Sequence, residues 1–268
     1  MKLKAIYKEL EVFNRISFEE STHKYFIDGQ PTQSPSVTQF LSRYKRPFNS
    51  DEAAKKLGKR IGVDPAEILK DWSQSNLFSR VLGSNVHRYI EHTYDNTVSF
   101  DQPIQDVHKL TKTQKADLKK LLPVLVKQFH QFQQDHKHLS FVASELAVGD
   151  LDGSRVCGTL DALMYNKKTK ELEILDFKTN KKIELSSPYG TLSEPFTFLP
   201  DCEHSTYTLQ LNVYKHFIEK YTSLKIGAMH IVWFNVKNKT YVPFKIKESK
   251  VQNILQQELF KMSVGLTT

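Results

Sequence analysis

Apolar residues recur at helical intervals through much of the first half of the chain. Asp64 has the features of a helix cap, because Pro65 follows it and Glu67 supplies an acid in the first turn. The periodic apolar positions predict three long helical segments, at Pro65 to about Trp72, Leu77 to Tyr94 and Gln114 to His136. Ahead of them, two short apolar runs around a polar turn predict a hairpin at 16–27, and a capping box predicts a short helix from Ser36.

From Phe141 onward the pattern changes to short apolar runs separated by polar turns, which is typical of strands. Asp152-Gly153 marks the first of these turns. Helical spacing returns between Ser205 and Tyr221, and two strands and a closing helix follow. The order helix, three strands, helix, strand extends from about Gln114 to Asn235 and predicts an α/β domain.

Acidic residues stand out in two of the apolar runs. Asp161 lies in one run, and the next run ends in Asp176-Phe177-Lys178. Side chains repeat every second residue along a strand, so Asp176 and Lys178 share one face, and a hairpin between the runs brings Asp161 beside them. Two carboxylates and an ammonium group at one strand end match the requirements of phosphodiester hydrolysis, which are a divalent cation, an activated water and stabilisation of negative charge.

This arrangement, with Gly158 three residues before Asp161, resembles the PD-(D/E)xK nuclease superfamily. Two more blocks strengthen the resemblance, because His87 lies in a helical segment upstream and Gln210-x-x-x-Tyr214 lies on a helix downstream. A helical histidine, then D…DxK, then QxxxY is the order of the RecB-type branch. Ser36-Val37-Thr38 further resembles the mitochondrial genome maintenance exonuclease and its phage-encoded relatives.

The resemblance implies a restriction-endonuclease-like α/β core, at 111–268, and an amino-terminal hairpin and helical region, at 1–110, that carries His87. It implies a metal-dependent DNA nuclease, specifically an exonuclease on single-stranded ends that serves DNA repair, replication or recombination. Oxygen ligands in a nuclease favour Mg²⁺, and one imidazole also admits Mn²⁺.

The same resemblance assigns roles to individual residues. It makes His87, Asp161, Asp176 and the backbone carbonyl of Phe177 the metal ligands. It makes Lys178 the residue that positions the attacking water, and Gln210 and Tyr214 the side chains that support the substrate.

Other residues have two interpretations. Glu145 is an acid in an apolar strand, and it is either an auxiliary carboxylate for a second metal ion or a core acid paired with a base. The irregular segment from Ile183 to His204 is unusually long for a compact domain. Its aromatic residues Tyr189, Phe196 and Phe198 either stack on unpaired bases or fix the loop to the core. Further candidate substrate contacts are Ser36, Thr38, Lys181 and Lys182.

Composition narrows the class of partner. The chain has 38 Lys and Arg against 30 Asp and Glu in 268 residues, with a pI near 9.2, which favours polyanions such as nucleic acid. Its two cysteines exclude a four-cysteine zinc or iron–sulfur site built by this chain alone. The sequence shows no signal peptide and no apolar run near 18 residues, so we expect an intracellular, cytoplasmic protein without a membrane segment. The resemblance to phage-encoded relatives admits a phage gene as its source.

Two alternatives remain open at this stage. One is a structure-specific endonuclease on the same core, which would use the same catalytic residues. The other is a nucleic-acid-binding module with an inactive nuclease site, against which the intact Asp161, Asp176 and Lys178 argue.

Overall fold

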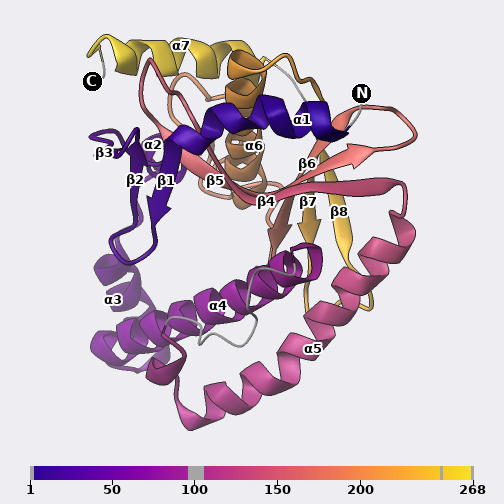
Figure 1. Cartoon of the computed structure of the whole chain (residues 1–268). Helices are drawn as coiled ribbons and strands as arrows, with labels where there is room; N and C mark the ends of the chain where they lie inside the picture. The colour runs from indigo at the N-terminus through magenta and orange to yellow at the C-terminus, as the bar shows by residue number, and fades with distance from the viewer. Residues whose placement is uncertain (1–2, 96–105, 248–249, 267–268) are drawn as a thin grey trace.

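The computed structural model describes residues 3–95, 106–247 and 250–266, and a mixed five-stranded sheet lies at its centre (Figure 1). The strands lie side by side in chain order, as β4 (Leu139–Gly149), β5 (Cys157–Asn166), β6 (Leu172–Lys178), β7 (Ile226–Trp233) and β8 (Val242–Ile246). Only the β6–β7 pair is parallel among them, so the chain crosses over between these two strands through helix α6 (Glu203–Tyr221). The predicted order of core elements is confirmed, and the α/β class with it.

Helices cover both faces of this sheet (Figure 1). Helix α6 packs on one face with α1 (Leu3–Leu10) and α7 (Val251–Ser263), while α4 (Pro65–Tyr94) and α5 (Lys112–Asp135) pack on the other. Alternation along β6 sends Ile174 into the α6 core and Leu175 and Phe177 into the α4–α5 core. Asp176 therefore faces the α6 side, like Ile174.

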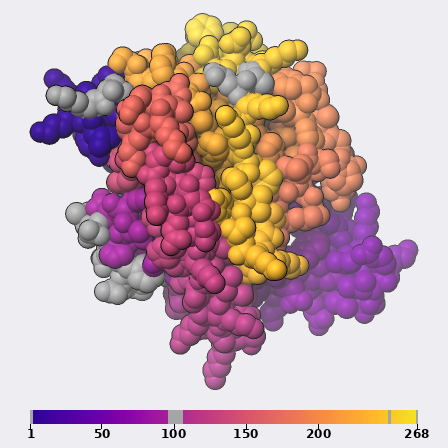
Figure 2. All heavy atoms as spheres, turned by 90° about the vertical axis from the view of Figure 1, so that its right-hand side faces the viewer, coloured from indigo at the N-terminus to yellow at the C-terminus, as the bar shows by residue number. Residues whose placement is uncertain are grey.

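A smaller unit precedes the main sheet. It contains the 3-10 turn η1 (Glu11–Arg15), the three strands β1 (Ile16–Glu19), β2 (Lys24–Ile27) and β3 (Gln30–Pro31), and helix α2 (Val37–Ser42). The predicted hairpin and the Ser36–Gln39 capping box are both present. Helix α3 (Ser50–Ile61) and the 3-10 turn η2 (Val107–Lys109) complete the described elements. Figure 2 shows α3 and the start of α4, in purple, projecting beside the body that the sheet forms.

Helix α4 is continuous over 30 residues, so the prediction of separate helices ending near Trp72 and beginning at Leu77 was wrong. The polar residues between these positions do not interrupt it, because Ser73, Ser75 and Asn76 are exposed while Gln74 is hydrogen-bonded to Gln114 of α5, at 2.7 Å. The continuous helix α4 thus connects the projecting helix α3 to the face of the sheet.

The turn between β4 and β5 is held by a buried carboxylate. Asp150 accepts hydrogen bonds from Ser154 N at 2.7 Å, from Lys220 Nζ at 2.5 Å and from the Tyr221 hydroxyl at 2.6 Å. Burial by itself raises the pKa of Asp150, but these three donors outweigh burial and hold it below its ordinary value. The carboxylate is therefore ionised and fixes the hairpin to α6.

Replacing Asp150 by alanine is expected to lower the free energy of unfolding by about 3–5 kcal/mol, because it leaves buried donors without their acceptor. Urea titration measures this cost, and Asp152→Ala, whose side chain is 71% exposed, is the matched control. The depressed pKa makes the contribution complete above the unfolded pKa of about 3.9. It is lost as the pH falls through the lower folded pKa, so the free energies of unfolding of the wild type and of Asp150→Ala should converge in acid. Equal stability of both variants at neutral pH would contradict this account.

Candidate active site

Three carboxylates lie in a row across the sheet. The antiparallel register of β5 and β6 puts Asp161 level with Asp176. On the other side of β5, the pairs that flank Glu145 on β4 put it opposite Asp161. Residues at one level of neighbouring strands lie close together, so the three carboxylates gather near the end of β6, where Asp161 Oδ2 accepts a hydrogen bond from Phe177 N.

His87 reaches this row from α4. Its Nδ1 lies 3.7 Å from Glu145 Oε1 and 3.7 Å from Asp161 Oδ1, and its Nε2 lies 2.9 Å from the carbonyl oxygen of Phe177. Burial lowers the pKa of His87, but the carboxylates of Asp161 and Glu145 outweigh burial and raise it to about 9. One ligand atom from each of His87, Glu145 and Asp161 lies within 4.8 Å of the others. The structure therefore brings the predicted His87 and Asp161 together with Glu145, which the sequence left between two interpretations.

Glu145 has an unusual backbone conformation. Its φ is +45°, which is rare for a residue with a side chain, and such strain is concentrated at functional sites. The side chain is 38% exposed and points at His87, whereas a core acid paired with a base would be buried. The geometry thus favours the auxiliary-carboxylate interpretation of Glu145.

Asp176 and Lys178 form an ion pair beside the His87 cluster. Lys178 Nζ lies 2.7 Å from Asp176 Oδ2, and the Asp176 side chain is only 2% exposed. Burial raises the pKa of Asp176 to about 6, and the charge of Asp161 adds to this while Lys178 opposes it. Burial lowers the pKa of Lys178, but Asp176 and Asp161 outweigh it and raise that pKa above its ordinary value. Lys178 is accordingly a fixed cation at this strand end.

The chain around Asp176 is held tightly. Phe177 N donates a hydrogen bond to Asp161 Oδ2 at 2.6 Å, which joins β5 to the end of β6. The Phe177 carbonyl, predicted as a metal ligand, here receives the hydrogen bond of His87 Nε2. This is the contact that a ligating histidine usually makes with its second nitrogen, because it fixes the ring and its tautomer.

Gln210 and Tyr214 lie on one face of α6, as the helical spacing predicted. Gln210 Nε2 donates to the Tyr214 hydroxyl at 2.9 Å, and Tyr214 is buried. They line a hollow of about 400 Å³ with Ser36, Thr38 and Tyr25. Ser36 uses its hydroxyl to cap α2 through Gln39 N.

The structure also identifies supporting residues that the sequence did not single out. Tyr207 of α6 places its ring 4.8 Å from Lys178 Nζ, a cation–π contact, and its hydroxyl accepts a hydrogen bond from Asn180. The carbonyl of Asn180 in turn accepts from Trp233 Nε1 and Asn235 Nδ2. The only sequence signal for Tyr207 was its position three residues before Gln210, on the same helical face.

The aromatic loop residues separate into two groups. Phe196 is fully buried and packs edge-on against Tyr44, so it has no free face and the base-stacking prediction fails for this residue. Tyr189 and Phe198 are 70% and 49% exposed, so both retain an open face. Lys181 and Lys182 are exposed directly after the site, and Lys182 forms an ion pair with Glu184.

These donors fit a divalent cation. Carboxylate oxygens with one imidazole nitrogen are a ligand set for Mg²⁺ or Mn²⁺. In addition, Asp176 Oδ2 is buried and has the Lys178 ammonium group 2.7 Å away. A carboxylate so far removed from solvent requires positive charge beside it, and a divalent cation would add to the charge that Lys178 supplies.

Comparisons with known proteins give a family for this arrangement. The model of the PD-(D/E)XK nuclease superfamily matches residues 65–262. No curated protein sequence matches the chain. Solved structures that resemble it include a "putative exonuclease" from Eubacterium rectale, with 14% identity, 71% of this chain and 69% of that chain covered, and a TM-score of 0.44. The protein SSO0001 is similar at 10% identity, with 66% and 72% of the two chains covered and a TM-score of 0.28. Within the described ranges, no helix combines the length and apolar composition needed to cross a membrane.

Proposed function

The chain belongs to the PD-(D/E)XK nuclease superfamily, and from this we propose that it is an exonuclease that uses Mg²⁺ or Mn²⁺ to shorten single-stranded DNA from an end. The observation that carries the proposal is the convergence of His87, Glu145 and Asp161 beside the Asp176–Lys178 ion pair. The superfamily implies a divalent cation and a nucleic-acid substrate. The RecB-type branch, the choice of DNA and the end requirement are parts of the proposal.

Each residue has a role that follows from its position. His87, Glu145, Asp161 and Asp176 hold the cation, which when bound neutralises phosphate charge and lowers the pKa of water. Lys178 is a fixed ammonium group two residues from Asp176 on the same strand face, so it orients the attacking water and stabilises negative charge on the phosphate oxygens. Tyr207 and Asp176 keep that ammonium group in place.

Gln210 and Tyr214 support the substrate from α6. Their hydrogen bond fixes the amide beside the hollow that also contains Ser36 and Thr38. An exposed ring, Phe18, lies in the same hollow and contacts Tyr25 with ring centroids 4.6 Å apart. Aromatic faces beside a catalytic site favour unpaired bases, because the bases of a duplex are already stacked on one another.

Gly158 keeps Tyr214 in this position. A methyl group added at Gly158 would lie 2.8 Å from Tyr214 Cε1 and 3.0 Å from Val37 Cγ2, so the tyrosine would have to move. We expect Gly158→Ala to fold but to cleave DNA on the order of tenfold to a hundredfold more slowly, because small displacements of positioning groups have effects of that size. Single-turnover cleavage measures the loss, and circular dichroism checks the fold. Cleavage at the wild-type rate would show that the position of Tyr214 does not matter.

Linear and circular single strands of one sequence test the end requirement. With Mg²⁺ or Mn²⁺, the linear strand should be shortened from an end while the covalently closed circle persists. Cutting of the circle as fast as the linear strand would replace the proposal with the endonuclease alternative. Binding of both forms without cleavage under either ion would favour the inactive binding module.

A further inference from the structure

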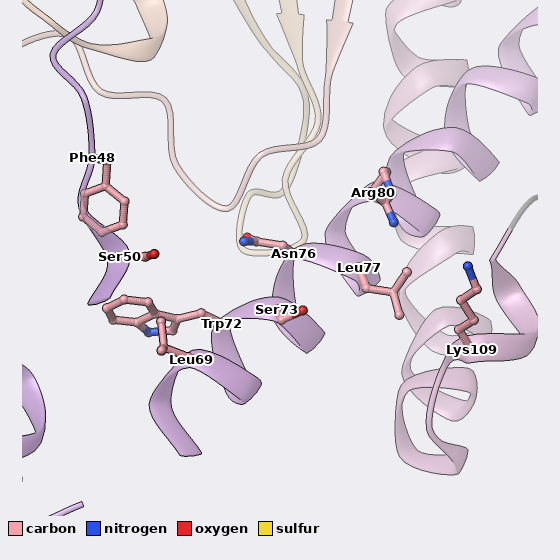
Figure 3. A pocket seen from close by; sticks show the side chains of 9 residues that line it. All are labelled: Phe48, Ser50, Leu69, Trp72, Ser73, Asn76, Leu77, Arg80 and Lys109. Atoms are coloured by element: carbon pink, nitrogen blue, oxygen red, sulfur yellow. The ribbon is translucent and has the colours of Figure 1, made fainter. Parts of the chain in front are cut away.

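A groove along helix α4 leads from the end of β6 to a pair of aromatic side chains. It begins as a hollow of about 490 Å³ between α4 and Thr179–Lys182, the residues that directly follow the catalytic lysine. A second hollow, of about 570 Å³, continues past Trp72 to Phe48 (Figure 3). Asn76 and Arg80 line both hollows, so the two form one continuous surface, here called the α4 groove.

The far end of the α4 groove is aromatic and open. Phe48, just before α3, is 74% exposed, and Trp72 is half-buried with its ring centroid 6.2 Å from that of Phe48 at an interplanar angle of 46°. In Figure 3 both rings border the same space. Large aromatic side chains are usually packed, so a solvent-open pair next to a hollow is a candidate surface for a flat ligand.

The charge of this region is positive. Arg80 and Lys109 lie in the second hollow, with Asp106 between them at 3.1 and 2.7 Å, so two cations share one carboxylate. At the other end, Lys181 is exposed. Nine basic and five acidic residues lie between 43 and 80, so this segment carries +4 of the formal net charge of +8. A polyanion is the complementary ligand.

The groove is aligned with the catalytic site by the helix itself. Trp72, Asn76, Arg80, Gly83 and His87 follow one another at intervals of three or four residues, so they form one stripe along α4. Trp72 and His87 are separated by about 22 Å along the axis, given a rise of about 1.5 Å per residue. A strand of several nucleotides spans such a distance.

We propose that the α4 groove binds the single-stranded part of a nucleic acid that extends from the catalytic site, with Phe48 and Trp72 stacking on unpaired bases. The inference rests on the proposed nuclease function and deepens it, because it names the region that selects a single strand. Arg80 and Lys181 contact the phosphates between the two ends. A duplex offers no free base faces to the rings, so the aromatic contacts belong to single strands alone.

The test is the affinity of the full-length chain for a fluorescein-labelled 20-nucleotide dT strand, measured by anisotropy in EDTA so that no cleavage occurs. Trp72→Ala is expected to weaken binding by about 5- to 140-fold, the equivalent of one lost base stack. Trp72→Phe, which keeps a ring, should restore most of the affinity. Phe260→Ala removes an aromatic side chain that is 65% exposed on α7, and it should leave the affinity unchanged.

Two further substrates separate this inference from the proposed function. Trp72→Ala should not change binding of a 20-base-pair duplex or Mn²⁺-dependent hydrolysis of bis(p-nitrophenyl) phosphate, which is too small to reach the groove. Unchanged affinity of Trp72→Ala for the 20-nucleotide strand, or an equal loss with the duplex, would overturn the inference. If the wild type hydrolyses no phosphodiester, the proposed function fails, while the dT affinities still decide the role of the groove.

Discussion

Lys178→Ala is expected to reduce single-turnover cleavage of DNA by on the order of a thousandfold or more, because in the proposed mechanism it removes the ammonium group that stabilises negative charge on the phosphate. Lys178 is also the partner of Asp176, so its loss leaves a buried carboxylate without its counter-charge. Affinity for DNA in EDTA should change little, since it arises from a much broader basic surface. This variant should therefore bind DNA almost as the wild type does while cleaving it far more slowly.

The controls for Lys178→Ala address folding and charge. Lys167→Ala removes one exposed charge from the β5–β6 turn at the opposite end of these strands and should cleave normally. Lys178→Gln keeps most of the side-chain length, and it should also be inactive if the positive charge is what matters. A folded Lys178→Ala protein that cleaves at the wild-type rate would show that the site is assigned to the wrong residues.

His87→Ala is expected to weaken Mn²⁺ binding by at least about tenfold, because even residues that only orient a metal ligand contribute about ten- to a hundredfold to metal affinity. The expectation rests on the position of His87 Nδ1, which lies 3.7 Å from Glu145 Oε1 and 3.7 Å from Asp161 Oδ1. Isothermal titration calorimetry with Mn²⁺ measures the affinity, and the metal concentration required for cleavage should rise in parallel.

A control substitution at another histidine tests whether the loss of Mn²⁺ affinity is specific to His87. His138→Ala removes an imidazole just before β4, where the His138 carbonyl accepts a hydrogen bond from Lys167 N of the β5–β6 turn, and should bind Mn²⁺ like the wild type. A structure with Mn²⁺ in which His87 lies more than about 4 Å from the ion would contradict its role as a ligand, since metal–nitrogen bonds are about 2 Å long.

The parts of the site that the sequence predicted are those set by local geometry. Asp161, Asp176 and Lys178 lie on two strands joined by a short turn, and alternation along the strand fixes which side chains share a face. The contact between Gln210 and Tyr214 follows from helical spacing alone. Such relations need no knowledge of how distant elements pack.

The position of Glu145 could not be predicted in this way. It lies opposite Asp161 only because of the register between β4 and β5, which shifts at a bulge between Phe141 and Ala143. A slip of one residue sends every later side chain to the other face of a strand. The sequence does not show such a bulge, so Glu145 remained between two interpretations until the register was known.

The remaining differences between the expectations from the sequence and the structure arise from long-range packing. Polar residues after Trp72 looked like a break between helices, yet α4 continues, because three of them face solvent and one contacts α5. Phe196 lies in a loop rich in turn residues, but it fills the core beside Tyr44. The pairing of Phe48 with Trp72 likewise depends on how α3 packs on α4, which no local pattern encodes.

The most direct test of the central claim is cleavage of an end-labelled linear single strand of DNA, with Mg²⁺ or Mn²⁺ and with EDTA, by the wild type and by Asp161→Asn. Asparagine keeps an oxygen that can accept the hydrogen bond from Phe177 N, so this variant loses the charge while the hairpin stays intact. We predict that the wild type shortens the strand only with a divalent cation, and that Asp161→Asn leaves it uncut under both conditions. Cleavage in EDTA, or equal cleavage by Asp161→Asn, would contradict a metal-dependent nuclease site at these carboxylates.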